Sequence, residues 1–91
     1  ILAILDVADG EAAAMRARAL RLSRLQRHRG PDWSGTHCAP GIVLAHERLA
    51  IVDVLHGAQP LLSPDGALSL AVNGEIYNHR ALRDGLAEPY A

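Results

Sequence analysis

Apolar residues gather in three short runs along the chain, and a segment with helical spacing separates the first two. The runs Ile1–Leu5, Ile42–His46 and Ala67–Val72 each predict a buried β-strand, because continuous apolar stretches of this length are typical of strands. The alanine-rich stretch Glu11–His28 predicts a helix. Its apolar residues fall near one stripe: Ala12, Met15, Ala19, Leu22 and Leu25.

The polar and turn-forming residues between these runs predict the remaining elements. Gly30–Pro31 should end the helix, and an ordered loop should follow over Arg29–Gly35. We expect a strand that begins at Thr36–Cys38, and an extended continuation of the second strand through Arg48–Val52. The later elements are a long connection over Asp53–Asp65, a hairpin turn at Asp65–Gly66, and a helix over His79–Leu86 capped by Asn78.

This order of elements predicts an α+β fold with a mostly antiparallel sheet covered by helix. The 91 residues suggest one domain or part of one. The single cysteine, Cys38, cannot form an internal disulfide, which favours a reducing, cytoplasmic setting. No apolar run reaches the roughly 20 residues that a membrane-spanning helix needs, so we expect no membrane partner.

The charged residues do not indicate nucleic-acid or metal binding. Arginines crowd the predicted helix, but the acidic residues outnumber the basic ones by ten to nine, so we expect a solvated face and no nucleic-acid partner. The five histidines lack the spacing of a metal site, and we expect no metal. Cys38 has no His or Asp at motif spacing, so we interpret it as a packing or surface thiol.

Asn73-Gly74-Glu75 follows the third apolar run and is the first candidate for chemistry. An Asn side-chain amide beside a backbone N–H that no Cβ crowds could hold an oxyanion. A hairpin turn with a capping Asn is the simpler interpretation of Asn-Gly. Glu75 could bind an ammonium group.

Arg48 is the second candidate, at the end of an apolar strand. Its guanidinium suits a carboxylate held by two parallel hydrogen bonds, so Arg48 and Glu75 together would suit an amino acid. A salt bridge between Arg48 and Glu75, with no ligand, is the alternative, and spacing does not decide between them.

Four motifs in order carry a resemblance to a known family. They are Arg27–Gly35 (RHRGPDWSG), His46–Asp53 (HERLAIVD), Gly57–Leu61 (GAQPL) and Asn73–His79 (NGEIYNH). Together they closely resemble the N-terminal glutaminase domain of glutamine-hydrolysing asparagine synthetases of the bacterial B type. The Asn-Gly-Glu element is shared with other class II glutamine amidotransferases.

The resemblance implies an N-terminal-nucleophile (Ntn) hydrolase fold, a four-layer αββα sandwich. Residues 1–91 would form about the first half of this glutamine amidotransferase type-2 domain. In the family a Cys, followed by Gly or Ser, precedes the strand that corresponds to Ile1–Leu5. That Cys is the nucleophile, and because it is absent from this sequence we expect the chain to be inactive by itself.

The resemblance also implies site residues and partners. Asn73 and Gly74 would supply the oxyanion hole, and Arg48 would bind the α-carboxylate of L-glutamine. Glu75 would bind the ammonium of L-glutamine, and Leu49, Ala50, Ile51 and Val52 would line the site with main chain. Ammonia would pass to a C-terminal synthetase domain, beyond this sequence, that uses ATP and Mg²⁺ to convert aspartate to asparagine in what could be a homodimer.

Two alternatives stay open. One is a class II amidotransferase with a different acceptor. The other is a non-catalytic amino-acid-binding module that keeps the fold and the Arg48–Glu75 pocket without a nucleophile.

Overall fold

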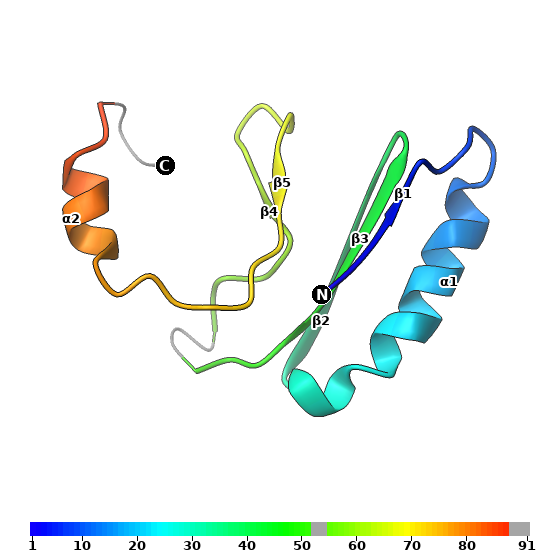
Figure 1. Cartoon of the computed structure of the whole chain (residues 1–91), viewed down its shortest axis with the longest axis horizontal. Helices are drawn as coiled ribbons and strands as arrows, with labels where there is room; N and C mark the ends of the chain where they lie inside the picture. The colour runs from blue at the N-terminus through cyan, green and yellow to red at the C-terminus, as the bar shows by residue number, and fades with distance from the viewer. Residues whose placement is uncertain (52–54, 88–91) are drawn as a thin grey trace.

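A three-stranded antiparallel sheet forms the centre of the fold, in the order β1-β3-β2 (Figure 1). The structure is a computed structural model that describes residues 1–51 and 55–87. The strands are β1 (Leu2–Leu5), β2 (Trp33–Ala39) and β3 (Ile42–Arg48). The fold is therefore α+β with an antiparallel sheet, as the sequence predicts.

The sheet register fixes which residues share a face. Ala45 of β3 lies opposite Leu2 of β1 and opposite Thr36 of β2. Side chains alternate along a strand, so Val43, Ala45 and Glu47 lie on one face of β3, and His46 and Arg48 lie on the other.

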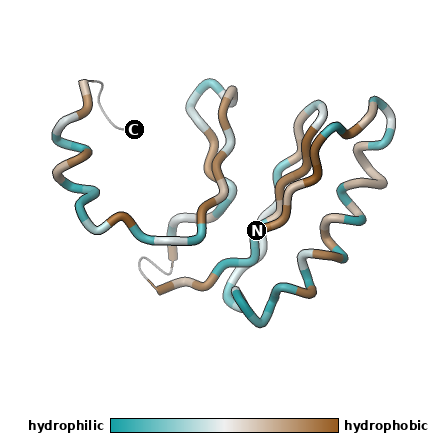
Figure 2. Tube along the Cα trace, viewed as in Figure 1, coloured by the Kyte–Doolittle hydropathy of each residue, from teal (hydrophilic) through white to brown (hydrophobic). Residues whose placement is uncertain are grey.

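Helix α1 (Ala12–Arg24) covers the first of these faces. Ala19, Val43 and Ala45 form the buried core, and Leu2, Ile4, Val7 and Met15 pack against it. The hydrophobic residues of β1 and β3 lie next to one another in Figure 2. The core is small, because alanine supplies two of its three fully buried members.

The buried stripe of α1 differs from the one expected. Its inward positions are Met15, Ala19 and Ser23, spaced four residues apart, whereas Leu25 is 72% exposed. The reason is that α1 ends at Arg24 and Ser23 is held against the sheet by a hydrogen bond to Glu47. The arginines of α1 are exposed to solvent, as predicted.

A 3₁₀ turn, η1 (Arg27–Arg29), connects α1 to β2. Gly30 ends this turn, where a Cβ would overlap the backbone C=O of Glu47. The expected loop over Arg29–Gly35 is wrong in its second half, because β2 begins at Trp33 and not at Thr36. The reason is that Trp33 pairs with Arg48 at the end of β3.

A small hairpin follows, formed by β4 (Leu61–Leu62) and β5 (Ser69–Leu70). The predicted hairpin turn is confirmed: Asp65 accepts hydrogen bonds from Ser63 Oγ at 2.5 Å and from the N–H of Ala67 at 3.0 Å.

Two predicted boundaries in this region are wrong. The connection expected over Asp53–Asp65 contains β4, and the strand expected over Ala67–Val72 is only Ser69–Leu70, because its partner β4 has two residues. The extended continuation expected over Arg48–Val52 is not strand at Leu49–Ile51, and Val52 lies outside the described residues.

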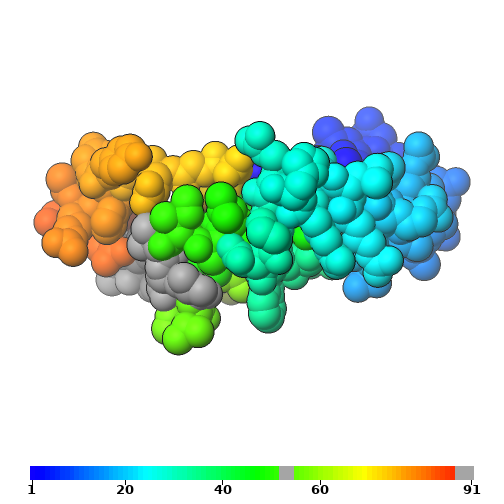
Figure 3. Space-filling view, turned by 90° about the horizontal axis from the view of Figure 1, so that it is seen from below, coloured from blue at the N-terminus to red at the C-terminus, as the bar shows by residue number. Residues whose placement is uncertain are grey.

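Helix α2 (His79–Asp84) completes the described chain. Asn78 stands at its N-cap position, as predicted, but its side chain makes no capping hydrogen bond. The molecule measures 42 × 30 × 18 Å, with α1 and the sheet toward one end and the hairpin and α2 toward the other (Figures 1 and 3). Among the described residues, no helix has the length and apolarity needed to cross a bilayer.

Candidate active site

A cavity of about 480 Å³ lies where the end of β3 meets the segment after β5. Arg48 lines it from β3, and Asn73, Gly74 and Glu75 line it from the segment after β5. The structure therefore brings together the two features that the sequence singled out. The remaining lining residues are His46, Leu49, Ile51, Gly57, Gln59, Leu61, Val72 and Tyr77.

Arg48 reaches the cavity because of its position in β3. It is half-buried and lies on the face of the sheet away from α1. Gly57 has a positive φ of 73°, and a Cβ there would lie 3.3 Å from Nη2 of Arg48. A glycine at position 57 therefore provides both the backbone conformation and the room that the guanidinium occupies.

Asn73, Gly74 and Glu75 form the opposite, solvent-exposed side of the cavity. A Cβ added to Gly74 would meet nothing within 4 Å, so the backbone here is open to an incoming molecule. A side-chain amide, an unobstructed backbone N–H and a carboxylate thus border the same cavity as the guanidinium. Such a set can bind an amino acid by both of its charged groups.

The segment after Arg48 is held by Asp32. Asp32 donates its backbone N–H to the C=O of Arg48 at 3.0 Å, and its carboxylate accepts the N–H of Ala50 at 2.9 Å. Of the predicted main-chain lining, Leu49 and Ile51 border the cavity, whereas the Ala50 N–H is directed to Asp32. The prediction for Val52 lies outside the described residues.

Sequence reasoning assigned no role to His46, which also lines the cavity. His46 is 5% exposed, and its Nε2 lies 3.1 Å from the C=O of Val72. A carbonyl only accepts, so Nε2 carries the proton and donates. Nδ1 is buried and has no hydrogen-bond partner in the described part of the chain. Burial lowers the pKa of His46, which favours the neutral ring.

Gln59 also went unassigned. Its Oε1 accepts the backbone N–H of Val72 at 2.7 Å. The alternation of side chains along β3 puts His46 on the same face as Arg48, and this alternation could have indicated that His46 lies at the site. No local pattern indicates Gln59, because its contact depends on how two loops meet.

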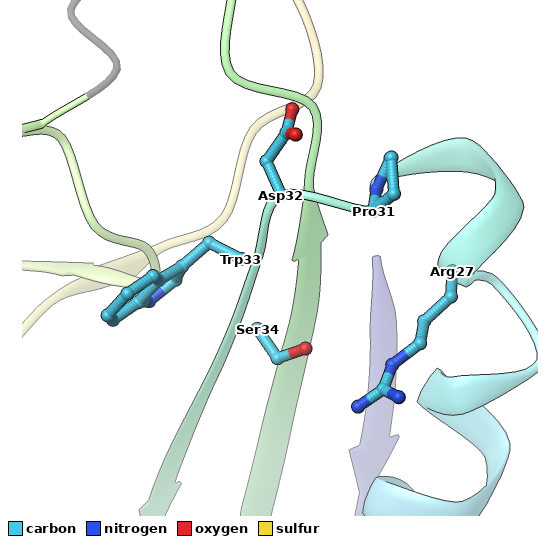
Figure 4. Close-up of a pocket in the computed structure, with 5 residues that line it drawn as sticks. All are labelled: Arg27, Pro31, Asp32, Trp33 and Ser34. Carbon is cyan, nitrogen blue, oxygen red and sulfur yellow. The ribbon is translucent and has the colours of Figure 1, made fainter.

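A buried hydrogen-bond cluster lies on the other face of β3. Glu47 accepts from Ser23 Oγ at 2.8 Å and from Ser34 Oγ at 2.6 Å, and Arg27 Nε lies 3.8 Å from its carboxylate. In Figure 4 the hydroxyl of Ser34 points to the side where Arg27 lies, and the indole of Trp33 points the other way. The cluster ties α1 and β2 to the residue that precedes Arg48.

A second cavity of about 400 Å³ lies beside this cluster, lined by Arg27, Pro31, Asp32, Trp33 and Ser34 (Figure 4). It contains none of the predicted site residues. Across residues 1–51 and 55–87, no group of three or more His, Cys, Asp or Glu side chains could hold a metal ion. Cys38 is exposed, in agreement with a surface thiol.

The start of β1 lies at the end of the sheet where Arg48 lines the first cavity. Leu2 pairs with Ala45, so an extension of the register by one residue would put Ile1 opposite His46. The Ile1 ammonium donates to Gln26 Oε1 at 3.0 Å. The ammonium of Ile1 also acts electrostatically on His46, which lines the first cavity, but Ile1 itself is not among the residues that line it.

Comparison with known proteins agrees with this geometry. Residues 1–90 match the family model described as "Glutamine amidotransferase domain". The chain is 58% identical over 80 residues to Escherichia coli asparagine synthetase B [glutamine-hydrolyzing], covering 88% of this chain and 14% of that protein. It is 57% identical over 86 residues to Arabidopsis thaliana asparagine synthetase [glutamine-hydrolyzing] 3, covering 94% of this chain and 15% of that protein.

A third relative matches nearly the whole chain. A probable asparagine synthetase [glutamine-hydrolyzing] of Schizosaccharomyces pombe is 56% identical over 90 residues, covering 99% of this chain and 16% of that protein. The chain therefore spans only a small part of the length of these curated relatives. With nearly all of its residues matched and three of the four motifs lining one cavity, the chain belongs to the glutamine amidotransferase domain family.

Proposed function

We propose that this chain forms part of the glutamine-hydrolysing site of an asparagine synthetase. One observation carries the proposal: Arg48 and Asn73-Gly74-Glu75, far apart in the sequence, line one cavity. The printed names of the relatives, which are glutamine-hydrolysing asparagine synthetases, support the choice of substrate.

In this proposal the cavity binds L-glutamine by its charged groups. The Arg48 guanidinium binds the α-carboxylate, and the Glu75 carboxylate binds the ammonium. Leu49, Ala50, Ile51 and Val52 provide the neighbouring main chain, with Leu49 and Ile51 at the cavity wall. These contacts leave the side-chain amide of glutamine to extend along the cavity toward Asn73 and Gly74.

Hydrolysis needs a nucleophile, and the register of β1 indicates where one would lie. If the pairing of Leu2 with Ala45 continued along both strands, a residue two places upstream of Ile1 would lie opposite Arg48. Opposite residues of antiparallel strands share a face, with Cβ atoms about 4.5–5.5 Å apart. A Cys at that place, as the family resemblance implies, would project toward the cavity and not toward α1.

The chemistry then follows from these groups. The thiolate forms a bond to the amide carbon, and the Asn73 side-chain amide and the Gly74 N–H stabilise the oxyanion, each donor being worth roughly 3–4 kcal/mol. The C–N bond breaks, and the nitrogen takes a proton and leaves as ammonia. The α-amino group of this Cys, which would be the start of the mature chain, has an ordinary pKa of about 8 and serves as the base for the thiol. Water then attacks the thioester and releases glutamate.

The larger protein supplies the rest of the proposal. The described helix and antiparallel sheet would be about half of an αββα Ntn-hydrolase sandwich, with residues 1–91 as the first part of that domain. Ammonia would pass to a C-terminal synthetase domain that uses ATP and Mg²⁺ to convert aspartate to asparagine. We propose a cytoplasmic setting, because a single cysteine is typical of proteins in a reducing compartment. We also propose that the full-length enzyme is a homodimer.

The test is an assay of the full-length protein with L-glutamine, ATP and aspartate. We expect glutamate and asparagine to form together, and Arg48→Leu to abolish most of both while ammonia-dependent asparagine formation persists. Glutamine hydrolysis without asparagine would instead indicate another acceptor. Glutamine binding without hydrolysis would indicate a non-catalytic binding module.

A further inference from the structure

Both backbone polar groups of Val72 are held by side chains. Its N–H donates to Gln59 Oε1 at 2.7 Å, and its C=O accepts from His46 Nε2 at 3.1 Å. Val72 lies beyond the end of β5 at Leu70 and takes no part in sheet pairing. Val72, the residue directly before Asn73, is therefore held by hydrogen bonds with two side chains. In a sheet, the backbone of a neighbouring strand would make such hydrogen bonds.

The two side chains are themselves well supported. His46 is 5% exposed and sits in β3, the central strand of the sheet. The backbone of Gln59 approaches β2 so closely that a Cβ on Gly35 would overlap the C=O of Gln59. The groups that hold Val72 are thus anchored on β3 and β2, and not on the exposed segment that they hold.

The protonation state of His46 agrees with this arrangement. Donation to a carbonyl needs the proton on Nε2, and Nδ1 then carries a lone pair. The buried Nδ1 has no partner among the described residues, and burial lowers the pKa of the ring. A neutral ring with a fixed tautomer directs its single donor at Val72.

We propose that His46 and Gln59 are positioning residues: they hold the two peptide groups that flank the Cα of Val72 and so set where Asn73 and Gly74 present their donors. The inference deepens the proposed function and depends on it. An oxyanion donor acts only when it meets the charge that develops in the transition state, and a displacement of about 1 Å can cost roughly 100-fold in rate. Because Arg48 is placed by β3, the contact with the substrate carboxylate should remain, and although Glu75 follows Gly74, kcat should fall more than KM rises.

The experiment measures glutamine hydrolysis by the full-length protein and separates kcat from KM. We expect His46→Leu and Gln59→Met to lower kcat roughly 10- to 100-fold while KM for glutamine changes less than about threefold. His46→Gln, whose amide N–H can reach the position of Nε2, should recover most of the loss. The matched control is His37→Gln, because His37 lies on β2 opposite Leu44, outside the cavity lining.

A common action on one residue, Val72, also predicts how the two changes combine. Either substitution frees Val72, so the double variant should lose little more than the worse single variant. Losses that multiply fully would contradict a shared role. Urea unfolding reports whether the amidotransferase domain of each variant is folded, and ammonia-dependent asparagine formation reports whether the synthetase domain is intact.

The outcomes separate this inference from the proposed function. If the wild-type protein does not hydrolyse glutamine, the proposed function fails. If it does, and both Gln59→Met and His46→Leu keep the wild-type kcat, the positioning role is wrong. If His46→Leu does not fold, Gln59→Met decides the question, since Gln59 is half-buried and Met keeps its length.

Discussion

Asp32 holds Ala50 by a hydrogen bond of 2.9 Å from the backbone N–H of Ala50 to the Asp32 carboxylate. The backbone N–H of Asp32 donates to the C=O of Arg48, so Asp32 contacts the chain on both sides of Leu49. Leu49 borders the cavity, and Arg48 is the proposed carboxylate ligand. Asp32, a loop residue, thus fixes the backbone conformation of the segment that follows β3.

We predict that Asp32→Ala weakens glutamine binding in the full-length protein. Without the carboxylate, the segment that carries Ala50 loses an exposed hydrogen bond worth about 0.5–1.5 kcal/mol. The KM for glutamine should rise roughly three- to tenfold, with kcat nearly unchanged. Asp32→Asn keeps an acceptor oxygen and should stay within about twofold of wild type, and an equal effect of both variants would contradict this explanation.

Gly35 should tolerate no side chain. A Cβ there would overlap the backbone C=O of Gln59 and lie 3.5 Å from Cδ of Pro60. Backbone on both sides of the contact leaves little room to relax, so Gly35→Ala should destabilise the amidotransferase domain by roughly 3 kcal/mol or more. Urea unfolding measures this. Gly74→Ala, where a Cβ would meet nothing within 4 Å, is the control and should unfold like wild type.

The cluster around Glu47 should contribute through its hydroxyls more than through its ion pair. The Glu47 side chain is 4% exposed, whereas that of Arg27 is 59% exposed. Ser23→Ala and Ser34→Ala should each cost about 1.5–3 kcal/mol, because each removes a hydrogen bond to a buried carboxylate. Arg27→Ala should cost less than about 1 kcal/mol. A larger unfolding cost for Arg27→Ala than for either serine variant would reverse this ranking.

The stability of the domain should fall in mild acid because of His46. Burial lowers the pKa of His46 below its ordinary 6.5; the Ile1 ammonium and Arg48 act in the same direction, and the Val72 hydrogen bond and Glu47 oppose it. Between the folded pKa and about 6.5 the unfolded chain binds more protons, so the stability present above pH 6.5 is lost as pH falls through the folded pKa.

Urea unfolding of wild type and His46→Gln at about pH 7.5 and pH 5 tests this sign. Wild type should lose more stability than the variant over this interval, since only wild type can protonate at position 46. Equal losses would show that His46 does not titrate in this range.

The sequence predicted an element correctly where residues close together along the chain determine its structure. The apolar runs at β1 and β3 indicate strands because both are buried against α1. Trp33–Gly35 has the composition of a loop and is strand only because it pairs with the end of β3. The two-residue partner β4 shortens the strand expected over Ala67–Val72, and no local pattern shows that.

The same distinction applies to the site. Arg48 and Asn73-Gly74-Glu75 were found because charged and turn-forming residues interrupt apolar strands. His46 and Gln59 were missed because they act on the backbone of Val72, a contact that exists only when three segments meet. The buried face of α1 was misassigned at Ser23 for a similar reason, since a serine is buried there only because Glu47 accepts its hydrogen bond.

The central claim is that the Arg48 guanidinium in this cavity binds the α-carboxylate of glutamine. The direct measurement is kcat/KM of the full-length wild type and Arg48→Leu with L-glutamine and with 4-aminobutanamide, which is glutamine without that carboxylate. Removing either partner should lower kcat/KM roughly 10- to 100-fold, and removing the second partner as well should cost little more. If Arg48→Leu lowers kcat/KM for 4-aminobutanamide as much as for glutamine, Arg48 does not bind the carboxylate and the account is wrong.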